Sequence, residues 1–179
     1  MISRLAAHKG FDLVCRVLDE MLWYDNIQVV LLGTGEAELE NYFRGLEAKY
    51  PKKFRAMIEF NKDLSKKIYA GADMFLMPSK SEPCGLSQMI ASRYGTVPIV
   101  RETGGLYDTI KPYNRYDGTG NGFSFSNYNA HEMMSVVRMA EELFCDRRAW
   151  NKLVRRVMAV DFSWNVSAAK YIELYKSLV

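Results

Sequence analysis

Short apolar runs alternate along this chain with longer segments in which apolar residues recur every three or four positions. Residues 27–32 form a nearly continuous run of β-branched and aliphatic side chains, which is typical of a strand covered on both faces. In residues 12–23, Leu13, Val17 and Met21 instead follow one another at four-residue spacing, which predicts a helix. Further strands are expected at 54–60, 74–77, 97–100 and 122–125, and further helices at 36–50, 64–70, 86–94, 130–144, 147–160 and 166–178.

The alternation of strands and helices predicts an α/β fold with a Rossmann-like parallel sheet flanked by helices. We expect a single domain over residues 1–179, with the helices in 130–179 included, because this length suits one domain of about 100–200 residues. Residues 1–4 resemble the end of a buried strand with nothing before it, so we expect the first strand to be truncated. Ligands of such sheets bind at the carboxyl ends of the strands, so the turns there are the candidate sites.

Composition and charge exclude several classes of protein. Hydrophobic residues make up 49% of the chain and charged residues 25%, as in an ordinary globular protein rather than a disordered one. The net charge is only +3, and positive and negative residues are evenly distributed, which argues against an electrostatic nucleic-acid binder. No apolar stretch approaches the roughly 20 residues of a membrane span. Cys15, Cys84 and Cys145 are too far apart to indicate a disulfide framework or a zinc site. The sequence therefore predicts a cytoplasmic domain without a metal, nucleic-acid or membrane partner.

Two of the expected turns carry cations or glycines that suit a phosphate ligand. Arg4 and Lys9 follow the first strand, where two fixed cations would neutralise a diphosphate. The alternative is that both are solvated surface cations. Gly33, Thr34 and Gly35 follow the second strand and would allow a ligand to approach the backbone closely, although an ordinary tight turn is the simpler explanation.

Two further turns offer groups for an anion and for a sugar. Thr103, Gly104 and Gly105 lie between a strand end and a helical turn, so their backbone N–H groups, with Arg101 beside them, would face a phosphate. Glu82 lies on the turn after the fourth strand, where a carboxylate would accept hydrogen bonds from sugar hydroxyls or stabilise positive charge at an anomeric carbon. The alternative is that Glu82 is a helix N-terminal acid that interacts with the helix dipole.

These turns, together with the segments between them, resemble the bacterial glycogen synthases and plant starch synthases. The matching motifs are KGFDL at 9–13, YAGAD at 69–73, EPCGLSQM at 82–89, RYGTVPIVR at 93–101, TGGLYDT at 103–109, NGF at 121–123 and DFSW at 161–164. The resemblance covers nearly the whole chain, and the stretch from 69 to 109 is highly specific.

Members of that family have two Rossmann-like domains that face a cleft, the GT-B fold, and this chain resembles the C-terminal, donor-binding half. The resemblance implies transfer of glucose from ADP-glucose to the non-reducing end of an α-1,4-glucan, with retention and without a metal or cofactor. It also implies a partner, the N-terminal acceptor domain, which this chain lacks, and a location in the cytoplasm, or in the plastid of a plant. We expect this chain alone to bind ADP or ADP-glucose weakly and not to elongate glycogen.

The resemblance also implies roles for individual residues. Arg4 and Lys9 would neutralise the diphosphate and help the leaving group depart, while Glu82 would hold the glucosyl hydroxyls; these three are the expected catalytic residues. Phe60 would pack on adenine, and residues 103–105 would bind the distal phosphate through backbone N–H groups. The full set of expected nucleotide-sugar-binding residues is Gly33, Phe60, Cys84, Gly85, Leu86, Thr103, Gly104 and Gly105.

One departure from the family pattern narrows the choice of enzyme class, and two alternative functions stay open. Ile90 stands where related retaining transferases carry a second glutamate, which favours glycogen synthases over sucrose or mannosyl transferases. The alternatives are a related retaining transferase that uses a UDP- or GDP-sugar and a non-catalytic nucleotide-binding module. A dehydrogenase is disfavoured because the first turn lacks the three-glycine fingerprint.

Overall fold

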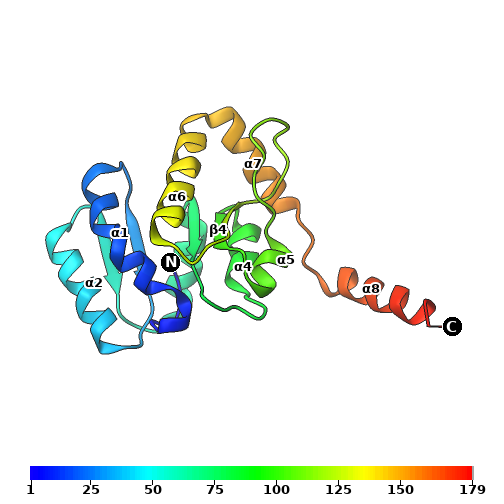
Figure 1. Ribbon diagram of the computed structural model, residues 1–179, viewed down its shortest axis with the longest axis horizontal. Helices are drawn as coiled ribbons and strands as arrows, with labels where there is room; N and C mark the ends of the chain where they lie inside the picture. Colours follow the sequence, from blue (N-terminus) through cyan, green and yellow to red (C-terminus); the bar gives the residue numbers. More distant parts are fainter. Residues whose placement is uncertain (179) are drawn as a thin grey trace.

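The computed structural model describes residues 1–178 and alternates helices with parallel strands (Figure 1). The strands are β1 (Val29–Leu32), β2 (Phe54–Met57), β3 (Met74–Met77), β4 (Val97–Arg101) and β5 (Phe123–Phe125). The helices are the short 3-10 helix η1 (Ala7–Lys9), α1 (Phe11–Tyr24), α2 (Ala37–Lys49), α3 (Lys62–Gly71), α4 (Ser87–Tyr94), α5 (Gly104–Thr109), α6 (Ala130–Cys145), α7 (Arg147–Ala159) and α8 (Trp164–Lys176). The α/β class and the order of the elements predicted from the sequence are confirmed.

Local signals explain where several of these elements begin and end. The side chains of Asn61, Asn129 and Asp146 accept hydrogen bonds from backbone N–H groups in the first turns of α3, α6 and α7. Strand β2 ends at Met57, whereas the apolar pattern extends the expected strand to residue 60. Phe60 therefore lies beyond the strand.

All strand pairs are parallel, but the sheet is divided into two. Strand β1 pairs with β2, and a second sheet has the order β3-β4-β5. Ile2 and Leu5 form only isolated parallel bridges, to Leu32 and Gly35, so the N-terminal segment makes no strand that joins the two sheets. The single sheet expected from the sequence is thus interrupted between β1 and β3.

A groove of about 1080 Å³ lies along this interruption. Val29 and Val30 of β1 line one side, Met74 and Leu76 of β3 line the other, and α1, α3 and α6 contribute further side chains. A continuous sheet would cover the apolar core at this position, so the core side chains here line an open groove instead.

The largest buried cluster brings side chains of α1, α2, α6 and α7 together with those of the strands. Within it the ring of Phe43 lies 5.6 Å from that of Phe11 and 5.9 Å from that of Phe54, between centroids. At the surface of the same region, Arg138 of α6 forms an ion pair with Asp25, the residue after α1, at 3.1 Å. Burial of the apolar side chains of this cluster away from water holds the helices on the strands.

Helix α8 contains no buried residue and projects away from the body of the chain (Figure 1). Trp164, its first residue, is 86% exposed, whereas Trp150 of α7 is buried. The prediction of one domain over residues 1–179 stays a prediction. Among the described residues, no helix is long and apolar enough to cross a membrane, and no group of three or more His, Cys, Asp or Glu is placed to hold a metal ion.

Candidate functional site

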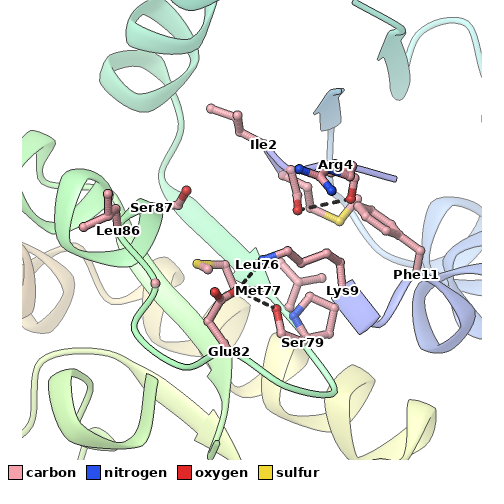
Figure 2. Close-up of a pocket in the computed structure, with 14 residues that line it drawn as sticks. Ile2, Arg4, Lys9, Phe11, Leu76, Met77, Ser79, Glu82, Leu86 and Ser87 are labelled. Carbon is pink, nitrogen blue, oxygen red and sulfur yellow. Dashed lines mark hydrogen bonds and ion pairs between the residues drawn. The ribbon is translucent and has the colours of Figure 1, made fainter. Parts of the chain in front are cut away.

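The three residues expected to be catalytic meet at one cavity beside the carboxyl end of β3 (Figure 2). The cavity has a volume of about 350 Å³. Arg4 and Lys9 line it from the N-terminal segment, and Ser79 and Glu82 line it from the turn that follows β3. The fold thus brings together charged residues that lie on separate turns of the sequence.

The position of Lys9 depends on a glycine that follows it. Gly10 has a φ of +76°, in the left-handed region where a side chain is strained. A Cβ atom at Gly10 would lie 2.0 Å from the carbonyl oxygen of Pro78. A glycine is therefore required for η1 to pack against the turn after β3, and this packing sets Lys9 opposite Glu82.

Lys9 and Glu82 form a largely buried ion pair, drawn with dashed lines in Figure 2. The Nζ of Lys9 donates to Oε2 of Glu82 at 2.6 Å, and Oγ of Ser79 donates to the same oxygen at 3.3 Å. The side chains of Lys9 and Glu82 are 22% and 11% exposed, so solvent screens the pair only weakly. The carboxylate is held by two donors, while the ammonium keeps further N–H groups for another acceptor.

Arg4 differs from Lys9 in its surroundings. Its side chain is exposed, and none of the ion pairs among the described residues includes it. The guanidinium at the rim of the cavity is therefore free to meet an anion from solution.

The loop that carries Glu82 lies directly against the start of α5. A Cβ atom at Gly104 would lie 2.3 Å from the carbonyl oxygen of Glu82, and one at Gly105 would lie 2.0 Å from that of Cys84. The N–H of Gly105 donates to the carbonyl of Glu82 at 3.0 Å. Of the three residues expected to bind a phosphate, Gly105 therefore already uses its N–H within the chain. The N–H groups of Thr103 and Gly104 have no partner in the described part of the chain.

Arg101 does not present its guanidinium to an anion, although the sequence places it beside the glycines. Its Nε donates to the carbonyl of Ser79 at 2.9 Å, and its Nη2 donates to that of Lys80 at 2.6 Å. Its Nη1 donates to the carbonyl of Ser126 at 3.3 Å. The side chain therefore fixes the backbone of the turn after β3.

The other expected binding residues divide by location. Gly85 and Leu86 line the cavity, and the thiol of Cys84 is exposed beside them. Phe60 is 91% exposed and lies outside the cavity lining. Its expected contact with adenine stays a prediction.

Gly33 also lies outside the lining, and the close approach that it permits is to the chain itself. A Cβ atom at Gly33 would lie 1.8 Å from the carbonyl oxygen of Ser3, and one at Gly35 would lie 1.9 Å from that of Leu5. The two glycines thus let the segment that carries Arg4 pack against the end of β1.

Two buried polar residues of the site are not among the site residues expected from the sequence. Ser79 donates to the carboxylate of Glu82, as described above. Gln88 is fully buried, and the two N–H donors of its Nε2 are shared among three acceptors: the carbonyls of Cys84 and Gly85 at 3.2 and 2.9 Å and Oγ1 of Thr109 at 3.1 Å. Gln88 thereby ties the loop to α5. Serine and glutamine in a loop and a first helical turn look like solvated residues until the fold supplies their partners.

Comparisons with known proteins give a consistent result. A protein-family model described as "Glycosyl transferases group 1" matches residues 1–156. The glycogen synthase of Lachnospira eligens is 56% identical over 179 residues, which cover 99% of this chain and 37% of that protein. The glycogen synthase of Clostridium acetobutylicum is 54% identical over 180 residues, which cover 100% of this chain and 38% of that protein.

A solved structure is also similar. The catalytic domain of starch synthase IV from Arabidopsis thaliana, bound to ADP and acarbose, has a TM-score of 0.86 and 36% sequence identity. The match covers 98% of this chain and 37% of that one. The chain thus spans a little more than a third of the length of these relatives.

Proposed function

Because the chain belongs to the glycosyl transferases of group 1, we propose that it is the donor-binding part of a glycogen or starch synthase. The whole protein is proposed to transfer glucose from ADP-glucose to the non-reducing end of an α-1,4-glucan, with retention of configuration. Identity of 56% to a glycogen synthase over the length of the chain supports this class of enzyme. The similar starch synthase structure contains ADP, which supports the choice of nucleotide. The proposal includes no metal ion and no cofactor.

The observation that carries the proposal is the meeting of Arg4, Lys9 and Glu82 at one cavity. When the bond between the anomeric carbon and the diphosphate breaks, negative charge accumulates on the departing ADP. Cations held in place beforehand stabilise that charge in the transition state more than in the bound substrate. We assign this role to the ammonium of Lys9, which Glu82 holds in place, and propose that the exposed guanidinium of Arg4 neutralises the same charge when the nucleotide binds.

Glu82 is assigned to the sugar. Glycosyl transfer passes through a state resembling an oxocarbenium ion, with positive charge at the anomeric carbon. A carboxylate fixed by Lys9 and Ser79 is suited to accept hydrogen bonds from glucosyl hydroxyls and to stabilise that charge. The unpartnered N–H groups of Thr103 and Gly104 are assigned to the distal phosphate.

The acceptor glucan is assigned to another part of the same protein, since this chain spans about 37% of the length of its relatives. We propose that the chain alone binds ADP or ADP-glucose without elongating glycogen. The whole enzyme is proposed to act in the cytoplasm, or in the plastid if its source is a plant.

Calorimetric titration of the purified chain with ADP, UDP and NAD tests the proposal. Wild-type chain should bind ADP in preference to the other two, and Arg4→Ala and Lys9→Ala should each weaken binding about tenfold or more through loss of a charged donor. Lys152→Ala, an exposed lysine of α7, is the matched control and should bind ADP as the wild type does. Equal affinity for UDP would favour a transferase with a different donor, and preference for NAD would contradict the proposal.

A second measurement concerns catalysis. The chain should incorporate no labelled glucose into glycogen when supplied with ADP-glucose. Incorporation by the purified chain would show that the acceptor glucan binds to residues of this chain itself.

A further inference from the structure

The turn after β3 is held from one side by the side chain of Arg101, the last residue of β4. The guanidinium donates to the carbonyls of Ser79 and Lys80 on this turn and to that of Ser126 after β5. A guanidinium is planar and carries five N–H donors in a fixed arrangement, so three such bonds fix its orientation as well as its position.

The opposite side of the same turn is held by the residue that precedes Lys9. The N–H groups of Lys80 and Ser81 donate to the carbonyl of His8 at 2.9 and 3.4 Å. Residues 79–81 therefore lie between the Arg101 guanidinium and the short helix η1 that carries Lys9.

The turn held in this way carries one of the two donors that orient the carboxylate of Glu82. Ser79 donates through its hydroxyl to Glu82, three residues further on, and the Lys9 ammonium reaches the same carboxylate oxygen. A shift of the Ser79 backbone would move the hydroxyl and the start of the loop to Glu82 together. Because Ser79 is buried, its carbonyl depends on Arg101 rather than on water for a donor.

Arg101 is itself supported by an aromatic ring. Its guanidinium carbon lies 5.6 Å from the ring centroid of Tyr128, and the Lys80 ammonium lies 5.7 Å from the same centroid. The hydroxyl of Tyr128 donates to the carboxylate of Asp12 at the start of α1. Partial burial of Tyr128, together with this hydrogen bond, raises the pKa of its phenol well above the usual range.

We propose that Arg101 is a positioning residue, which sets the Glu82 carboxylate for the sugar of the donor by fixing the backbone of residues 79–80. The inference rests on the proposed function, because the sugar enters only through it. Arg101 donates to backbone carbonyls and not to the nucleotide, so its removal should affect recognition of the glucosyl group more than recognition of ADP.

The variants Arg101→Gln and Arg101→Lys test this inference, with Arg155→Gln, an exposed arginine of α7, as the matched control. Arg101→Gln should weaken binding of ADP-glucose about tenfold, while its affinity for ADP changes by less than about threefold. Arg101→Lys should restore only part of the loss, since one ammonium cannot reproduce the planar arrangement of three donors. Arg155→Gln should bind both ligands like the wild type, and melting temperatures show whether each variant is folded. Equal weakening of ADP and ADP-glucose by Arg101→Gln would overturn the inference.

Amide hydrogen exchange followed by NMR separates this inference from the proposed function. In Arg101→Gln, the amides of Lys80 and Ser81 should exchange faster, because the turn that bonds to His8 is released. The amide of Val97, which donates to Asp73 at 2.9 Å in the β3–β4 region, should exchange as in the wild type. If the wild type binds neither ligand, the proposed function fails, and unchanged exchange at Lys80 and Ser81 would then overturn the positioning role as well.

Discussion

Lys9 and Glu82 are 73 residues apart in the sequence, yet the Nζ of Lys9 lies 2.6 Å from Oε2 of Glu82. The contact joins the N-terminal segment to the turn after β3 and closes one side of the candidate site. It also means that the cation assigned to the diphosphate and the carboxylate assigned to the sugar are already in contact with each other. Removal of either one changes the surroundings of the other.

The Lys9–Glu82 pair is expected to show a measurable coupling in stability. Lys9→Met leaves a carboxylate that is only 11% exposed with one donor fewer, so the free energy of unfolding should fall by about 1–3 kcal/mol. Glu82→Gln combined with Lys9→Met should be less destabilising than the sum of the two single changes. Urea unfolding of the four proteins in a double-mutant cycle measures this coupling.

The pair between Lys66 and Asp63 on α3 is the control for that cycle. Its side chains are 56% and 86% exposed, so solvent screens the interaction and the coupling should be much smaller. Similar coupling in the two cycles would contradict the buried character of the Lys9–Glu82 pair.

Alanine at Gly105 is expected to disrupt the site. The new Cβ would lie 2.0 Å from the carbonyl oxygen of Cys84, so the loop that carries Glu82 must move away from α5. Calorimetry should show ADP-glucose binding weakened about tenfold or more, because the loop no longer presents its groups in place.

Gly45, which has free space around it, provides the control for the change at Gly105. A Cβ at Gly45, inside α2, would meet nothing within 4 Å. Gly45→Ala should therefore raise the free energy of unfolding by about 0.5–1 kcal/mol, through better helix propensity, without a change in ligand binding. Loss of binding in Gly45→Ala would show that binding responds to any glycine replacement rather than to the contact at Gly105.

Thr96 is expected to stabilise the fold without contributing to the site. The single O–H of its fully buried side chain is shared between the carbonyl of Tyr69 and, at 2.9 Å, that of Ala72. Thr96→Val removes the donor from two carbonyls and should lower the free energy of unfolding by about 1–3 kcal/mol. Thr96→Ser keeps the hydroxyl, so its free energy of unfolding should fall by less than that of Thr96→Val. Urea unfolding measures both, and a greater loss for the serine variant would show that the methyl group matters more than the hydrogen bonds.

Stability is expected to fall at alkaline pH through two partly buried acids, Cys15 and Tyr42. Burial raises the pKa of the Cys15 thiol from 9.0 to about 11, and burial raises that of Tyr42 from 10.0 to about 12. Both groups stay protonated in the folded chain at a pH where the unfolded chain has lost those protons. The unfolded chain therefore binds fewer protons, and stability falls as the pH rises from about 9 to about 12.

The variant Cys15→Ala isolates the thiol contribution. Its free energy of unfolding, measured by urea at several pH values, should decrease less steeply between about pH 9 and 11 than that of the wild type. Identical slopes would mean that Cys15 ionises as readily in the folded chain as in the unfolded one.

Comparison of the expected and observed elements shows which properties are local to the chain. The four-residue spacing predicts a helix at 12–23, and the structure has α1 at Phe11–Tyr24, because amphipathic spacing depends only on neighbouring residues. The end of β2 is different. Its last paired residue, Met57, stands opposite Leu32, the last residue of β1, so the partner strand and not the apolar run determines where the strand ends.

Part of the candidate site is likewise recognisable from the sequence alone. Motifs around Lys9, Glu82 and Gly104 are contiguous in the sequence, so the turns that carry them are recognisable without a structure. The contribution of Gln88 is not recognisable, because its three acceptors lie on two different segments that only the fold brings together.

The sequence by itself determined the kind and order of the elements, the enzyme family and the turns that hold the candidate chemistry, because periodicity and motifs are properties of short stretches of chain. The tertiary structure alone decided that Glu82 pairs with Lys9, that Arg101 binds backbone carbonyls instead of an anion, and that Gly33 makes room for Ser3. These contacts join residues that are distant in the chain. Their geometry depends on the packing of the helices and sheets around them, which no local pattern encodes.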